Sequence, residues 1–141
     1  MPFSKVYGAY VGFIFAFLSI ILFDLATSTF GVWSFLTSTT YGVLGIAGAY
    51  YLRNRKANSW NFAKFAIVGT LFFDAVTGLS IGPLFFSQPF SEAFFGQIPF
   101  TLWHLLGNVS FALVLSPAIY RYVVENKKLE IYAKSEKIFT T

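Results

Sequence analysis

Four long apolar runs, separated by short polar or broken segments, set the pattern of the chain. They predict helices at about 6–24, 32–52, 62–79 and 100–124. An apolar helix of about 20 residues crosses the roughly 30 Å of hydrocarbon in a bilayer. The pattern therefore predicts an all-α membrane protein, in which a bundle of four transmembrane helices forms a single domain over residues 1–124.

The stretch between the third and fourth runs is apolar but interrupted by Gly82-Pro83, Pro89 and Ile98-Pro99. Within it, PFSEAFFG predicts a short outer helix at about 89–96 that stops at Gly96. Backbone that is broken at membrane depth needs protein or water around it, so this proline-broken segment is expected to be interfacial or re-entrant. The polar tail at 125–141 is expected in the cytoplasm.

Composition agrees with a membrane protein. With 56% hydrophobic and 11% charged residues, the chain has too few charges to cover a soluble surface. The first run, Val6 to Phe23, also fits a signal peptide, but no small-residue cleavage site follows cleanly and the run ends in Asp24. A first transmembrane helix is the better interpretation.

The basic residues indicate an orientation. If the N-terminus is cytoplasmic, four crossings place Lys5, the Arg53–Lys64 cluster and the Arg121–Lys137 tail on the cytoplasmic side. This distribution obeys the positive-inside rule and predicts that both termini are cytoplasmic. Because these residues gather at helix ends and not along a stripe, the net charge of +4 does not indicate nucleic-acid binding.

Polar groups that an apolar chain should avoid are concentrated between Phe73 and Asn108. A carboxylate inside the membrane costs about 2.5–3.5 kcal/mol on insertion scales, so such residues are functional-site candidates by default. The predicted ligand-binding residues are Asp74, Thr77, Gln88, Glu92, Gln97, Thr101, His104 and Asn108. No cysteine is present, and the one His has no HxxH or HExxH spacing, so neither a metal site nor a cofactor is predicted.

Helical spacing brings these polar residues into two stripes, formed by Thr70, Asp74 and Thr77 on the third helix and by Thr101, His104 and Asn108 on the fourth. Together they predict a cup that opens to the outside. A buried Asp74–His104 pair and a ligand-contacting role are both compatible with the pattern. No arrangement of Ser, His and Asp that would support catalysis is recognisable, so the chain is not expected to be an enzyme.

Small residues and hydroxyls form two further patterns. Gly8, Gly12 and Ala16 recur at a spacing of four, which predicts a face for close helix approach, either within the chain or to a partner subunit. The hydroxyl residues clustered at 34–40 predict a polar pocket at that end of the second helix. A weak repeat, FDLAT at 23–27 and FDAVT at 73–77, is compatible with a duplicated hairpin or with coincidence.

The central motif runs D74-xx-TG-x-S-x-GPLFF, then Phe90, then GQIPFT-xx-HLLGN-xx-FA-xxx-SP-x-IYR. It resembles small prokaryotic membrane proteins related to the S components of energy-coupling-factor transporters. In that superfamily a helical bundle, usually of six helices, captures a vitamin or metal and docks on a transmembrane T component driven by ATPases. The resemblance implies an outer ligand pocket, a docking helix with small residues, and a multi-pass location in the prokaryotic inner membrane.

Pattern and resemblance together predict a solute-capturing, S-component-like transporter subunit that binds a small molecule or ion from the outer face. The chain contains no GxxxxGK[ST] loop, so an ATP-driven cycle would require a T component and ATPase subunits as partners. The alternative is a structural or accessory subunit of a membrane complex, in which the polar cup seats a neighbouring protein or a lipid head group.

Overall fold

The computed structural model describes residues 1–125, and this part of the chain contains helices but no strand. The helices, in order, are α1 (Pro2–Ala26), α2 (Trp33–Leu52), α3 (Ser59–Gly78), α4 (Ile81–Phe85), α5 (Phe90–Ile119) and the π-helix η1 (Tyr120–Val124). The predicted all-α class is thereby confirmed. The predicted polar tail lies outside the described residues except for Glu125.

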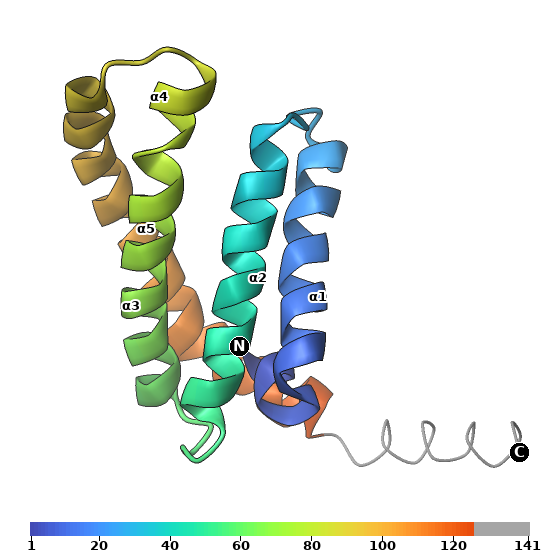
Figure 1. Cartoon of the computed structure of the whole chain (residues 1–141). Helices are drawn as coiled ribbons and strands as arrows, with labels where there is room; N and C mark the ends of the chain where they lie inside the picture. The colour runs from blue at the N-terminus through green and yellow to red at the C-terminus, as the bar shows by residue number, and fades with distance from the viewer. Residues whose placement is uncertain (126–141) are drawn as a thin grey trace, which may run out of the picture.

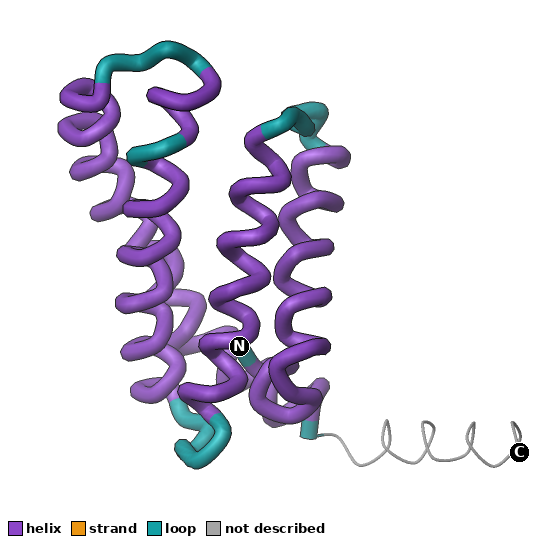
Figure 2. The backbone as a smooth tube through the Cα atoms, in the orientation of Figure 1, coloured by secondary structure: helices purple, strands orange, loops and turns teal. Residues whose placement is uncertain are grey.

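The helices form two hairpins, α1 with α2 and α3 with α5 (Figure 1). The loop after α1 and the segment after α4 lie at one end of the bundle, which we call the α4 end (Figure 2). The loop at 53–58 and the end of the described chain lie at the opposite, basic end. Lys5 also reaches the basic end, where its Nζ donates to the carbonyl oxygens of Leu52 at 2.7 Å and Arg55 at 2.6 Å.

Three helical stretches are long and apolar enough to cross a membrane: Pro2–Ala26, Ser59–Phe85 and Phe90–Val124. Protein covers little of them, since only 11% of the apolar window in the first stretch and 6% in the third are buried. Such large exposed apolar surfaces are compatible with lipid and not with water. The described chain is therefore an all-helical membrane protein.

α2 is the exception among the four expected spans. It has 20 residues, but hydroxyls in its first half and glycines in its second half make it too polar to count with the other three. Of the hydroxyls expected to form a polar pocket, Thr37, Ser38 and Thr40 donate to carbonyl oxygens of α2 itself. Hydroxyls in helices commonly bond backwards in this way, so their presence in α2 does not require a pocket.

The small-residue pattern on α1 serves packing inside the chain. Gly12 is buried against Gly45 of α2, and a Cβ on Gly45 would collide with the Gly12 carbonyl oxygen. Ala16 is buried as well. Gly8 instead marks a change of direction in α1, with φ 86° and ψ −175°, a conformation that glycine adopts without strain. Of the two uses predicted for this face, the structure therefore has the internal one at Gly12.

The separate short helix expected at 89–96 is wrong, because α5 runs without a break from Phe90 through Pro99 to Ile119. Proline removes one backbone hydrogen bond, yet an apolar helix in lipid has no better way to satisfy its remaining backbone groups than to continue. The interruption lies earlier, at Ser87, whose φ is 53°. The expected re-entrant segment thus divides into α4, a four-residue link at 86–89, and the first turns of α5.

A small core joins the two hairpins near the basic end. Leu52 closes α2 and packs with Phe62 and Ala66 of α3 and Ala112 of α5. Towards the α4 end, the buried residues of α3 are small or polar, namely Gly69, Thr70, Asp74 and Thr77. The hairpins are therefore held together by large side chains at one end and leave space further along.

The contact between Gly12 and Gly45 predicts a large effect of one added methyl group. We expect Gly45→Ala to lower the free energy of unfolding by about 1–3 kcal/mol, because the two backbones must separate. Gly107→Ala is the matched control, since a Cβ there meets nothing within 4 Å. Denaturation of both variants in the same detergent checks this, and equal stability of the two would show that the close approach is unimportant.

Candidate functional site

A buried acid and the one histidine of the chain form the centre of the candidate site. His104 Nδ1 on α5 lies 2.6 Å from Asp74 Oδ1 on α3. Asp74 is 1% exposed, and its second oxygen, Oδ2, has no protein partner among the described residues. A buried carboxylate is stable only when it is paired, so this contact fixes the two helices relative to each other.

A second contact between the same helices lies one turn further along. Asn108 Nδ2 on α5 donates to Thr70 Oγ1 on α3 at 2.9 Å. The spacing of four residues on both helices, from Asp74 to Thr70 and from His104 to Asn108, makes the two cross-links parallel rungs. The predicted stripes on the third and fourth spans therefore do face each other.

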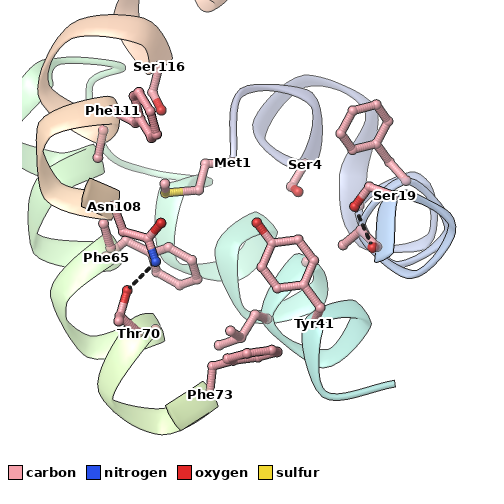
Figure 3. A pocket seen from close by; sticks show the side chains of 18 of the residues that line it. Met1, Ser4, Ser19, Tyr41, Phe65, Thr70, Phe73, Asn108, Phe111 and Ser116 are labelled. Atoms are coloured by element: carbon pink, nitrogen blue, oxygen red, sulfur yellow. Dashed lines mark hydrogen bonds between the residues drawn. The ribbon is translucent and has the colours of Figure 1, made fainter. Parts of the chain in front are cut away.

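A cavity of about 550 Å³ lies between the two hairpins and is lined from α1, α2, α3 and α5. Figure 3 shows it from close by, with Thr70 and Asn108 on one side and Ser4 and Tyr41 on the other. His104 also lines this cavity, so one member of the Asp74–His104 pair forms part of its wall. A space of this size is typical of a small-molecule site, for which about 300–1,000 Å³ is usual.

Aromatic contacts bridge the hairpins above the core. The rings of Tyr41 on α2 and Phe73 on α3 meet edge to face at 5.8 Å, and Phe73 also lies 6.1 Å from the His104 ring. Near the α4 end, Trp33 at the start of α2 lies 5.1 Å from Phe86, just after α4. The cavity thus has the core at one end and an aromatic bridge at the other.

The structure separates the eight predicted site residues into three groups. His104 and Asn108 line the cavity, and Asp74 bonds to His104 without lining the cavity itself. Thr77, Gln97 and Thr101 lie nearer the α4 end. There the Thr77 hydroxyl donates to the Phe73 carbonyl at 2.8 Å, and Gln97 Nε2 donates to Thr101 Oγ1 at 3.1 Å.

Gln88 and Glu92 do not join the others. Both are exposed, and the structure places them in the link after α4 and in the first turn of α5. They were predicted because they lie in the proline-broken segment, part of which is the unbroken first half of α5. The described residues also contain no group of three or more acidic, His or Cys side chains that could hold a metal.

Several polar residues of the cavity were not predicted. Ser4 and Ser19 come from α1, Tyr41 from α2 and Ser116 from α5. Tyr41 carries a recognisable signal, since it lies in the middle of its helix, whereas most tyrosines of the chain occupy the helix ends that aromatic rings prefer. A single serine in an apolar run gives no comparable signal, because it so often bonds to its own helix.

The two copies of the weak repeat adopt one local feature in common. The Thr27 hydroxyl donates to the Phe23 carbonyl at 2.9 Å, just as Thr77 does to Phe73. Asp74 is buried in the site, whereas Asp24 is half-buried near the end of α1. The repeat therefore contributes one carboxylate to the site and not two.

Comparisons of the chain with protein-family models, with curated proteins and with solved structures found no match. The candidate site consequently rests on its own geometry. Its defining features are a paired acid and histidine, a parallel amide–hydroxyl rung, and the cavity between the hairpins.

The Asp74–His104 contact predicts strong coupling in a double-mutant cycle. Asp74→Asn and His104→Gln should each lower the free energy of unfolding, by up to about 3–5 kcal/mol, because each leaves a buried polar partner uncompensated. The double variant should lose less than the sum of the two single losses. Glu92→Gln, at an exposed acid, is the control. Additive losses in detergent denaturation would contradict the pair.

Proposed function

We propose that this protein is a solute-capturing subunit of a membrane transporter, similar to the S components of energy-coupling-factor systems. The observation that supports the proposal is the cavity of about 550 Å³ between the hairpins, lined by all four long helices. Because its walls come from two hairpins joined mainly at one end, a small movement between them would open or close it. Coupling to ATP hydrolysis would then come from a T component and ATPase partners.

The proposed topology has four crossings with both termini in the cytoplasm, in the inner membrane of a prokaryotic cell. Two observations support it. Lys5, Arg53, Arg55 and Lys56 gather at the basic end, as the positive-inside rule requires for a cytoplasmic surface. α2 packs closely against α1 at Gly42 and Gly45, and its Ser34, Ser38 and Thr40 are buried, so α2 can cross the membrane as part of a hairpin that meets lipid on its outside.

Docking of a partner is proposed on a face other than the one predicted first. Gly12 is already covered by α2, and Ala16 is buried and lines the cavity, so neither is available to a T component unless the helices move. The exposed apolar side chains of α1 lie on its other side, among them Tyr10, Ile14 and Leu18. In this proposal, lipid or a partner helix meets these residues.

A structural or accessory subunit is the second candidate. It is favoured by the Asp74–His104 contact, because a carboxylate that is paired at 2.6 Å needs no ligand to make its burial tolerable. We assign no catalytic role, since the side chain at hydrogen-bond distance from His104 among the described residues is the Asp74 carboxylate and not a Ser, Thr or Cys that His104 could activate.

Solute capture predicts that the purified protein carries or binds a small molecule in its cavity. We expect mass spectrometry of gently extracted protein to find a bound solute that Gly69→Leu loses, because Gly69 lines the cavity and the new side chain would fill it. Gly107→Leu is the matched control, since it lies outside the cavity lining and has open space.

The solute contents of the two glycine variants can be compared only if both melt at the wild-type temperature, which shows that both are folded. A protein with no bound solute, together with strong Asp74–His104 coupling and a partner that copurifies in fixed ratio, would replace solute capture by the structural role. Equal solute content in both variants would place the solute outside this cavity.

The topology can be tested on the same protein, because the chain contains no cysteine. Ser91→Cys, at the α4 end, should react with a membrane-impermeant thiol reagent in intact cells. Asn54→Cys, in the exposed loop at the basic end, should react only after the cells are opened. The reverse pattern would invert the orientation and move the α4 end to the cytoplasm.

A further inference from the structure

Three hydroxyl groups at the cavity have no hydrogen-bond partner among the described residues. Ser4 is 4% exposed and Ser116 is 8% exposed, and both line the cavity. The Tyr41 hydroxyl points into the same space as Ser4, from the neighbouring helix (Figure 3). These hydroxyls are accessible from the cavity, so water or an entering molecule can hydrogen-bond to them there.

The opposite wall offers acceptors. Asn108 uses its Nδ2 on Thr70, which leaves its carbonyl oxygen without a protein partner among the described residues. The Nδ1 atom of His104 is bonded to Asp74, so the second ring nitrogen, Nε2, likewise has no protein partner among the described residues. The free groups therefore lie on both hairpins, with hydroxyls of α1 and α2 on one side and α5 groups on the other.

Between these polar groups the walls are aromatic. Phe15, Phe65, Phe73 and Phe111 come from α1, α3 and α5 and line the same cavity. Aromatic walls favour a flat apolar body, because rings stack or meet edge to face at short distances. The wall thus combines aromatic surface with separate hydrogen-bonding groups.

The lining contains no Asp, Glu, Lys or Arg side chain. Asp74 does not line the cavity itself but is bonded to His104, which does. The titratable groups of the lining residues are His104 from α5, Tyr41 from α2 and the α-amino group of Met1. Burial lowers the pKa of that amino group to about 6, so it is mostly uncharged at neutral pH. A ligand with a full charge would lose its hydration without gaining an opposite charge, which strongly disfavours its entry.

We propose that the captured solute is an uncharged, flat aromatic molecule with hydrogen-bonding groups at its edge, held between the Ser4 and Tyr41 hydroxyls and the Asn108 and Ser116 side chains. This inference rests on solute capture and adds the chemical class of the solute. The volume of the cavity, about 550 Å³, accommodates a body of two fused rings.

Three probes of one shape and different charge test the class: 2-naphthamide, 2-naphthoate and 2-naphthylmethylammonium. Added to the full-length protein in detergent, the neutral amide should raise the melting temperature in a concentration-dependent manner, because a ligand of the native state stabilises it. The two charged probes should have little effect at the same concentrations. Equilibrium dialysis gives the affinities.

Variants connect the binding to the named groups. Tyr41→Phe, Ser4→Ala and Ser116→Ala should each weaken naphthamide binding by about three- to tenfold, the usual effect of one lost hydrogen bond. Ser110→Ala is the control, since Ser110 is exposed on α5, lies outside the cavity lining and bonds to its own helix at Leu106. Tyr41→Phe keeps the ring, so its contact with Phe73 is preserved.

The outcomes separate the two proposals. Binding of a charged probe with equal or greater affinity, or a copurified solute that is charged or aliphatic, overturns the class while leaving solute capture in place. Naphthamide binding that none of the three hydroxyl variants weakens overturns the assignment of the site. Absence of both probe binding and a native solute removes solute capture together with this inference.

Discussion

The backbone contact between α1 and α2 at Gly12 and Gly45 is the constraint on which the rest of the structure depends. Lipid supplies no hydrophobic force between helices, so they associate through close packing and polar contacts. The first hairpin uses glycine for this, and the second uses the Asp74–His104 and Thr70–Asn108 rungs. Each hairpin is thus held by its own means, and the core around Leu52 and Phe62 joins them mainly near the basic end. The cavity is the space that this division leaves.

The sequence was sufficient to predict whatever depends on local periodicity. Apolar runs predicted the helices, and helical spacing predicted that Asp74 and His104 could lie on facing stripes. The unbroken course of α5 through Pro99 was not predictable, because proline and glycine signals describe preferences in water, where a broken helix can bond to solvent. In lipid the cost of unsatisfied backbone groups outweighs the loss of one hydrogen bond.

The cavity itself was beyond prediction for a different reason. Its walls come from helices far apart in the chain, and a serine such as Ser116 has the same local pattern whether it bonds to its own helix or is left free. Only the packing of Gly12 on Gly45 and the position of the core decide which side chains face the space. Conversely, Gln88 and Glu92 were predicted to be site residues because they lie close in sequence to the other polar candidates. In the structure both are exposed and neither lines the cavity.

The aromatic contact between Trp33 and Phe86 bears on how fast a molecule could enter from the α4 end. An aromatic pair of this kind contributes only about 0.5–1.5 kcal/mol beyond the apolar area that it buries, so it is a weak contact. Side-chain motion that separates two such rings is fast on the scale of solute binding. Entry at this end would be limited by removal of water from the incoming molecule, and exit by the contacts it makes inside.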